Sequence, residues 1–263
     1  MRRFRSLPFC LIAISRIAAA QTIEKPRDPR EVMPERPTVA THAYTVAPGY
    51  IEIEAGVESD RFDDGSRTFL FGTNTKIGLA GHLQLGILVP FQGGNPGHVG
   101  AGDVTLDVKW RILDNDPVLG NFALLPAVKL ATGPTALGRG TGTTDGMITL
   151  ISSRTIGPVS MDLNIGYTRR SGDGSAAPRD AMLWTASFGG SLYRRVGWAF
   201  ECYGYPATSG PAGQGAYSAL LFGPTFSPSR MLVFDTGAIV PLAGDQSYGL
   251  YAGVVWNAGR IAH

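Results

Sequence analysis

The stretch from Gly102 to Asp114 alternates between apolar and polar side chains at every step. The apolar parity comprises Val104, Leu106, Val108, Trp110 and Ile112, and the polar parity comprises Asp103, Thr105, Asp107, Lys109 and Arg111. Only an extended strand with two unlike faces gives this pattern, because successive side chains of a strand point to opposite sides. The sequence therefore predicts a strand with one apolar and one polar face.

The same parity recurs almost to the end of the chain in segments of about ten residues, the length that a tilted strand needs to cross a bilayer. We expect about twelve strands, at residues 50–58, 67–79, 82–91, 102–113, 121–131, 144–155, 158–169, 181–193, 196–205, 216–226, 230–240 and 247–257. The predicted fold class is all-β, an antiparallel up-and-down transmembrane β-barrel of the bacterial outer-membrane type. It would occupy residues 49–257, with residues 258–263 as a C-terminal tail.

The predicted connections alternate between tight turns and longer, glycine-rich loops. Ala80-Gly81, Ile156-Gly157 and Arg194-Arg195 lie at turns, whereas Gly138–Gly142 and Ser209–Gly213 lie in loops. This alternation is typical of outer-membrane barrels, which place turns in the periplasm and loops outside the cell. With both termini periplasmic, the long loops fall on the outer side.

A soluble β-sandwich or a lipocalin-like barrel is the alternative fold, in which the apolar parity would fill the interior. The aromatic residues favour the membrane barrel, because they gather near strand ends on the apolar parity, as interfacial girdles do. They include Trp110, Trp184, Trp198, Trp256, Phe69 and Tyr248.

The first twenty residues have the pattern of a secretory signal peptide. Three arginines among the first five residues precede a mostly apolar stretch, and Ala18-Ala19-Ala20 forms a small-residue cleavage site. We expect residues 1–20 to be removed during export. Residues 21–263 then carry 19 basic and 21 acidic residues, a net charge of −2, with Cys202 as their single cysteine. This charge offers no electrostatic basis for nucleic-acid binding, and one cysteine cannot form an intramolecular disulfide.

Residues 21–48 are rich in proline and charge and show no apolar period, so we expect no regular structure there. The segment could hang free in the periplasm or fold into the barrel mouth as a partial plug. The free leader is favoured, because the segment offers little apolar area to offset the entropy of ordering.

The polar parity is assigned to the lumen, where both signs of charge occur in near balance. The candidate lumen-lining residues are Glu52, Glu54, Lys76, Gln84, Asp103, Asp107, Lys109, Arg111, Lys129, Arg154, Asp162, Asn164, Glu201 and Asp235. Such charges either pair across the lumen and close it or line a hydrated channel. The sequence leaves both arrangements open.

Catalytic and metal-binding motifs are not found. Outer-membrane lipases place a histidine and a serine two residues apart on one strand, so that both face the same side. The residues two positions after His42, His82 and His98 are Tyr44, Gln84 and Gly100. No metal-ligand spacing or phosphate loop appears either. We expect no enzymatic activity, no metal site and no cofactor, although a lipid-modifying enzyme with a non-standard dyad is a third possibility.

Several segments resemble the family of outer-membrane proteins of the phenol-degradation meta pathway, whose members are labelled transporters. The segments are Gly102–Arg111, Leu125–Gly133, Gly140–Asp145, Gly157–Tyr167 and Tyr251–Asn257. The resemblance covers most of residues 49–257 in order. It implies an outer-membrane channel for the uptake of aromatic or other hydrophobic compounds, and it carries over no catalytic residue.

From these observations we expect a barrel that admits small, aromatic or hydrophobic solutes passively. The alternative is a closed barrel with a structural or surface-interaction role, in which the loops are the functional part. The expected surroundings and partners are outer-membrane lipid, lipopolysaccharide, the barrel-assembly machinery and the small-molecule solute.

Overall fold

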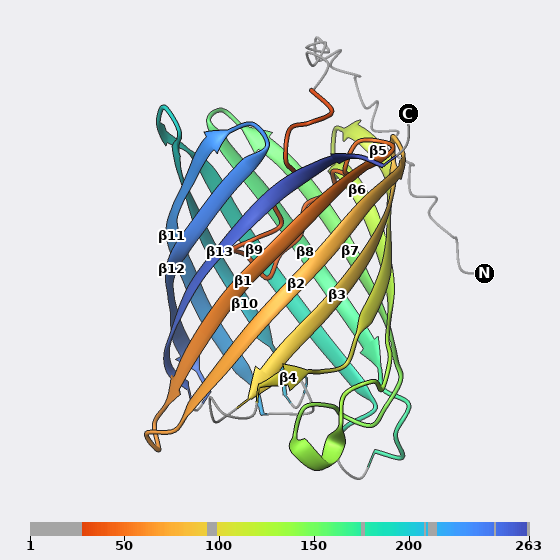
Figure 1. The fold of residues 1–263 in the computed structure, drawn as a ribbon, viewed down its shortest axis with the longest axis vertical. Coiled ribbons are helices and arrows are strands. Elements are labelled where there is room, and N and C mark those ends of the chain that lie inside the picture. Colours follow the sequence, from red (N-terminus) through yellow and green to blue (C-terminus); the bar gives the residue numbers. More distant parts are fainter. Residues whose placement is uncertain are drawn as a thin grey trace, which may run out of the picture.

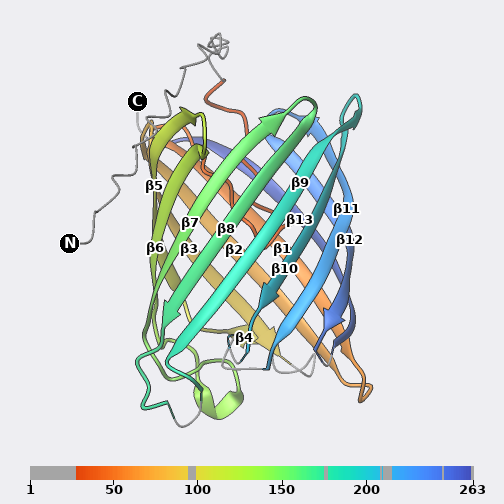
Figure 2. The same ribbon diagram turned by 180° about the vertical axis from the view of Figure 1, so that it is seen from behind.

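The computed structural model describes residues 28–93, 99–174, 177–207, 209, 215–244 and 246–261. The expected signal peptide and its cleavage site lie outside these residues. The described chain forms one antiparallel sheet of thirteen strands that closes on itself through pairing of β2 with β3 and of β1 with β13 (Figures 1 and 2). Twelve strands form the wall, which confirms the predicted barrel.

The twelve wall strands follow one another around the barrel in chain order. They are β1 (Tyr50–Phe62), β2 (Arg67–Ala80), β3 (Leu83–Gly93), β5 (Thr105–Asp116), β6 (Gly120–Lys129), β7 (Asp145–Ile156), β8 (Val159–Arg169), β9 (Asp180–Tyr193), β10 (Val196–Tyr205), β11 (Tyr217–Ser229), β12 (Leu232–Ala243) and β13 (Gln246–Arg260). The short β4 (Gly100–Ala101) pairs with the end of β3 in a long connection.

Several strand boundaries differ from the sequence expectation, and three of these differences change where an acidic residue or the expected tail belongs. Strand β1 continues to Phe62, which adds Asp60 to the wall. Strand β5 begins at Thr105, so Asp103 belongs to the connection that precedes it and not to a strand. Strand β13 runs to Arg260, because its pairing with β1 extends to Tyr50, and this takes in the first residues of the expected tail.

Tight turns join the strands at one end of the barrel, where the described residues also begin and end, and the longer connections lie at the other end (Figure 1). We call the half of the lumen next to the tight turns the inner half, and the half next to the long connections the outer half. Positive φ angles at Asn115, Gly120, Gly157 and Arg194 close three of the tight turns.

The two faces of the wall differ as the alternation predicts. On β5, Leu106 and Trp110 point outward and are 39% and 48% exposed, whereas Lys109 points into the lumen and is fully buried. Outward-facing aromatic residues sit near the strand ends, including Phe69, Trp184, Phe226 and Trp256. The apolar parity therefore forms the outer surface and the polar parity lines the lumen. No helix in the described part of the chain is long and apolar enough to span a membrane.

Candidate functional site: the lumen and its plug

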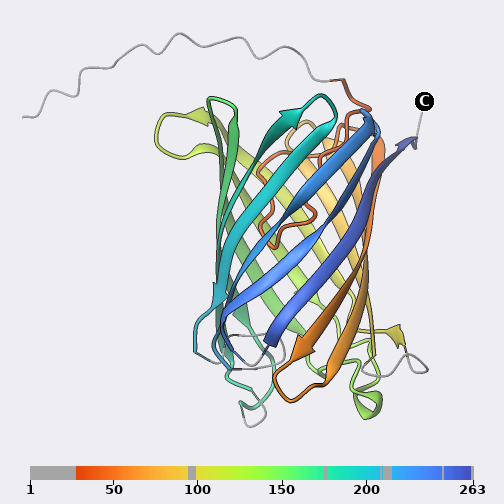
Figure 3. The same ribbon diagram turned by 90° about the vertical axis from the view of Figure 1, so that its left-hand side faces the viewer.

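Residues 28–48, which we call the plug, enter the lumen from the inner end and lie inside the barrel (Figure 3). The plug contains no helix or strand, but it is not free. The expectation that this segment hangs outside the barrel is therefore wrong. That expectation considered apolar area alone, and the plug is held mostly by polar contacts with the wall.

Seven backbone N–H groups of the plug donate to side chains of the wall. Glu52 and Glu54 of β1 accept from Met33 at 2.6 Å and from Glu35 at 2.8 Å. Glu201 of β10 accepts from two successive N–H groups, those of Val39 and Ala40, at 2.7 and 2.6 Å.

The other three N–H groups bind neutral acceptors on three further strands. Asn164 Oδ1 accepts from Thr41 at 2.7 Å and Ser153 Oγ accepts from Ala43 at 2.8 Å. Gln84 Oε1 accepts from Val46 at 2.9 Å. The wall thus replaces the hydrogen bonds that an irregular segment would otherwise need from water.

Two lysines form the centre of a buried ion network. Lys76 Nζ lies 2.6 Å from Glu52 Oε1 and 2.7 Å from Glu54 Oε1, and it donates to the carbonyl oxygen of Met33 at 2.7 Å. The side chains of Lys76 and Glu52 are fully buried. Each charge therefore has a partner inside the lumen, as buried charges require.

Lys109 joins the plug to the opposite wall. Its Nζ pairs with Glu35 and donates to Thr41 Oγ1 at 2.7 Å and to the carbonyl oxygen of His42 at 2.9 Å. Removal of Lys76 would leave the carboxylates of Glu52 and Glu54 without a counter-charge, whereas removal of Lys109 would leave Glu35 only Lys76 Nζ, at 3.8 Å. The network fills the space between the plug and the wall in the inner half of the lumen.

Arg36 of the plug lies against the seam between β1 and β13. Its Nη2 lies 3.2 Å from Asp235 Oδ1 on β12 and 3.4 Å from the carbonyl oxygen of Ala252. The guanidinium fits beside Gly56 and Gly253, which face each other across the two strands, and a methyl group on either glycine would overlap it. The missing side chains create the space that this cation occupies.

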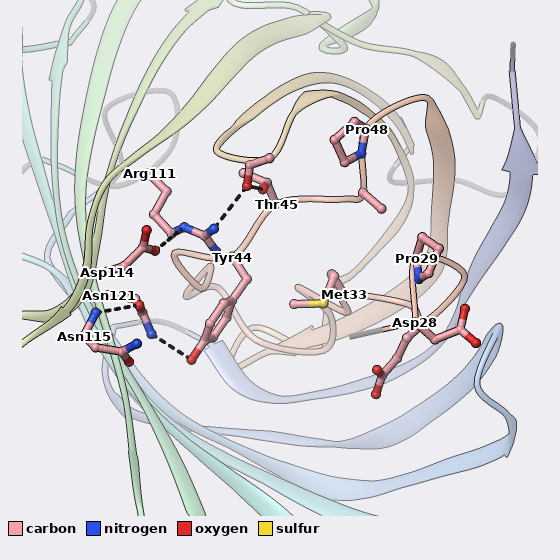
Figure 4. A pocket seen from close by; sticks show the side chains of 13 residues that line it. Asp28, Pro29, Met33, Tyr44, Thr45, Pro48, Arg111, Asp114, Asn115 and Asn121 are labelled. Atoms are coloured by element: carbon pink, nitrogen blue, oxygen red, sulfur yellow. Dashed lines mark hydrogen bonds and ion pairs between the residues drawn. The ribbon is translucent and has the colours of Figure 1, made fainter. Parts of the chain in front are cut away.

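A cavity of about 520 Å³ lies between the plug and the wall at the inner mouth. Figure 4 shows Arg111 and Asn121 of the wall on the left with Tyr44 of the plug beside them, and Met33 and Asp28 of the plug to the right. The Tyr44 hydroxyl accepts from Asn121 Nδ2 at 3.0 Å, and Arg111 Nε lies 2.8 Å from Asp114 Oδ1. The cavity is thus polar and opens toward the inner end.

The outer half of the lumen is lined differently. Among lumen-facing residues at this height, Glu58, Asp60, Tyr205 and Tyr217 remain partly exposed, and Leu88 is 39% exposed. Plug residues contact the wall no farther outward than the level of Gly56. The described residues therefore leave the outer half accessible to solvent.

The structure brings eight of the predicted lumen residues together around the plug: Glu52, Glu54, Lys76, Gln84, Lys109, Asn164, Glu201 and Asp235. Asp107 and Asp162 face the lumen beside this group, where Asp162 Oδ1 accepts from Ser153 Oγ at 2.5 Å. Arg111 lies at the inner mouth, and Arg154 donates to the carbonyl oxygen of Pro117 at 2.7 Å in a tight turn.

Asp103 and Lys129 form a separate group at the outer end. Lys129 Nζ lies 2.7 Å from Asp145 Oδ2 and 3.5 Å from Asp103 Oδ2. Asp103 also accepts from the N–H groups of Gly133 and Thr141, at 2.9 and 2.8 Å. Burial alone would raise the pKa of Asp103, but these hydrogen bonds and the Lys129 charge hold it below its usual range. This group ties the loop between β6 and β7 to the wall.

Several residues of the site were not among the sequence candidates. Glu35 and Arg36 were hidden in a segment without periodicity, while Glu58, Asp60 and Tyr251 share the lumen parity of their strands. The parity could have identified these last three. Of the histidines, His82 lies exposed next to a tight turn, and the described residues contain no cluster of three or more potential metal ligands.

No protein-family model and no curated protein matches the chain. Solved structures match it in fold. The COG4313 outer membrane channel from Pseudomonas putida F1 is 14% identical with a TM-score of 0.63, and the match covers 86% of this chain and all of that one. The NanC porin (10% identity, TM-score 0.52, 79% and 98% covered) and the KdgM porin (9%, 0.50, 78% and 98%) are similar in the same way. At these identities the likeness shows the fold: the chain is a closed twelve-stranded barrel of the kind found in outer-membrane channels and porins.

Proposed function

We propose that this protein is an outer-membrane channel for small solutes, which enter the outer half of the lumen and pass the plug to leave at the inner mouth. The observation that carries the proposal is the incomplete filling of the lumen. A barrel that served only as a scaffold would fill its interior with side chains. Here the outer half keeps partly exposed lumen-facing residues, and a cavity of about 520 Å³ lies beside the plug at the inner mouth.

The barrier in this channel is the mid-height contact between plug and wall. It combines hydrogen bonds and ion pairs with small apolar contacts, such as that of Ala43 with Ala123 and Ile151. A shift of this one short segment would connect the two solvent-accessible spaces. The fold likeness to the Pseudomonas putida channel supports a channel role. The resemblance of the sequence to the phenol-degradation transporters supports aromatic or hydrophobic molecules as the solutes. Outer-membrane lipid and lipopolysaccharide would surround the barrel.

A closed barrel with a surface-interaction role is the second candidate. The full burial of Lys76 and Lys109 favours it, because a dry ion network blocks the lumen in the conformation described here. Under this alternative the plug would stay docked, and the long loops would carry the function.

Reconstitution of the purified full-length chain into planar bilayers separates the two candidates. We expect small stepwise conductance from the unmodified protein and a larger conductance from the Glu201→Ala variant, which loses the acceptor for two plug N–H groups. Silence of both proteins, when heat-modifiability on gels shows that they are folded, would reject the channel and favour the closed barrel.

A further inference from the structure

Four tyrosines and two carboxylates form one wall of the outer lumen. The tyrosine wall, as we call it, consists of Glu58 and Asp60 on β1, Tyr203 and Tyr205 on β10, Tyr217 on β11 and Tyr251 on β13. The register places Glu58 directly opposite Tyr251, and Tyr205 directly opposite Tyr217. The ring centroids of Tyr203 lie 6.4 Å from Tyr205 and 5.9 Å from Tyr217. Aromatic faces and negative charge therefore share one surface.

This surface is accessible from the lumen. Glu58, Asp60, Tyr205 and Tyr217 are only partly buried, although all four point inward. On the other side of the lumen, Leu70, Leu88, Thr105, Met147 and Thr149 are neutral. The charged residues Asp103, Lys129 and Asp145 on that side pair with one another at the outer end. A solute in the outer half would therefore meet the carboxylates of Glu58 and Asp60 beside the tyrosine rings.

Buried polar atoms beside the tyrosine wall lack a partner. The Tyr251 hydroxyl and Asp235 Oδ2 belong to residues that are each 4% exposed, and neither atom has a hydrogen-bond partner among the described residues. The missing side chains of Gly223 and Gly237 make room for the Tyr251 hydroxyl on the lumenal surface of the sheet. Unpaired buried acceptors are costly, so a donor that reached these atoms would be stabilised there.

The chain's own cation already occupies the inner edge of this surface. Arg36 lies at the level of Gly56, one lumen-facing position inward from Glu58, and bonds Asp235. No described lysine or arginine forms an ion pair with Glu58 itself. The guanidinium of Arg36 thus shows which chemistry this part of the lumen accepts.

We propose that the tyrosine wall is a binding site for small organic cations, such as aromatic amines in their ammonium form. Tyrosine faces attract ammonium groups through the ring quadrupole, and carboxylates add charge-assisted hydrogen bonds. A cation at the wall would donate toward Glu58, or toward the Tyr251 hydroxyl, which lies over Gly237 on the other side of β13, while its apolar part packs on the rings. This inference rests on the proposed channel and names the class of solute that it selects.

Binding to the full-length protein in detergent micelles tests the site without any conductance. Benzylammonium, benzyl alcohol and benzoate share a ring and differ in charge, and isothermal titration calorimetry compares their affinities. We expect benzylammonium to bind about tenfold more tightly than benzyl alcohol, and benzoate to bind least. Equal or tighter binding of benzyl alcohol or benzoate would overturn the proposal.

Two variants and one control locate the binding. Glu58→Gln keeps the shape and removes the charge, so we expect about a tenfold loss of benzylammonium affinity, and Tyr251→Phe about a threefold loss. Asp64→Asn removes one charge from the exposed loop between β1 and β2 and should leave the affinity unchanged. Equal losses in Glu58→Gln and Asp64→Asn would show that the effect is general electrostatics, and no loss in Glu58→Gln would exclude the tyrosine wall.

The binding result and the channel result are independent. Silence in planar bilayers together with selective benzylammonium binding would reject the channel and keep the site. Conductance without any preference among the three compounds would keep the channel and reject the site.

Discussion

The inner and outer halves of the lumen are lined by the same strands, yet the chain uses them in opposite ways. In the inner half, Lys76, Lys109, Glu52 and Glu54 are almost fully buried and bind the plug. In the outer half, Glu58 and Asp60 continue the same parity of β1 but remain partly exposed. The difference shows that a polar lumen position has no fixed role: the presence of the plug decides whether its charge is structural or available to a solute.

The largest expected effect of a single change lies at the centre of the inner half. Lys109→Glu should lower the free energy of unfolding by about 3–5 kcal/mol, because it places a second negative charge beside buried Glu35. Urea titration in lipid vesicles measures this loss. The charge swap Lys109→Glu with Glu35→Lys should recover part of it. A change below about 1 kcal/mol would show that this charge is hydrated, like an exposed one.

The next effect concerns the anchoring of the plug. Glu201→Ala leaves the N–H groups of Val39 and Ala40 unpaired, at a cost of about 2–4 kcal/mol, whereas Glu58→Ala in the outer half should cost little. Movement of the plug is measured by thiol labelling of an Ala40→Cys variant that also carries Cys202→Ser. A membrane-impermeant thiol reagent reaches the cysteine at position 40 only when the plug moves. Equal labelling rates in the Glu201→Ala and Glu58→Ala variants would contradict the proposed difference between the inner and outer halves of the lumen.

A smaller effect is expected at the boundary between the halves. Gly253→Ala places a methyl group against the Arg36 guanidinium and should cost about 1–3 kcal/mol through displacement of that side chain. Gly72→Ala is the matched control, since it lies on the lumen face at the same height and its added methyl would meet nothing within 4 Å. Calorimetric melting of both variants tests whether Arg36 needs the space left by the missing side chain of Gly253. Similar losses of stability in the two variants would contradict this.

At the outer end, acid should release a loop before it unfolds the barrel. The pKa of Asp103 is lower in the folded protein than in the unfolded chain, so its contribution to stability is present at neutral pH and is lost as the pH falls through the folded value. Below about pH 4 the loop between β6 and β7 should become sensitive to pepsin. Asp103→Asn should show that sensitivity at higher pH, and resistance in both proteins would contradict the anchor.

The smallest expected effect on stability lies in the outer half. Glu58→Gln should change the free energy of unfolding by less than about 0.5 kcal/mol, because a partly hydrated charge contributes little to the fold. The same variant should reduce the preference for K⁺ over Cl⁻ in bilayers, measured as a shift of the reversal potential. A large stability loss would place Glu58 with the buried network of the inner half.

The strands were predictable from the sequence because apolar and polar residues alternate with the outward and lumenal faces of each strand. Leu106 and Lys109 lie on opposite parities of β5, so the first faces outward and the second faces the lumen. Most of the lumen candidates follow from the same rule. Asp103 fails it, because the strand begins two residues later and a loop binds the carboxylate.

The plug was not predictable in this way. Its hydrogen bonds come from its backbone, which every residue possesses, so the amino-acid sequence of residues 28–48 contains little sign of them. The wall residues give an indirect indication, because Glu201 and Asn164 need hydrogen-bond partners in a narrow lumen. The sequence leaves open whether these partners are water, other wall residues or the N-terminal segment. Only the three-dimensional placement of the acceptors decides among these.

The hydrogen bonds of the plug also constrain the order of folding. The side chains that accept these hydrogen bonds lie on β1, β3, β7, β8 and β10, which are far apart in the chain. They surround one lumen only after β13 pairs with β1 and closes the barrel. Contacts of such long sequence separation are slow to form, because the chain must close large loops first. The segment that precedes every strand in the chain should therefore be the last to become ordered, after the ring of strands is complete.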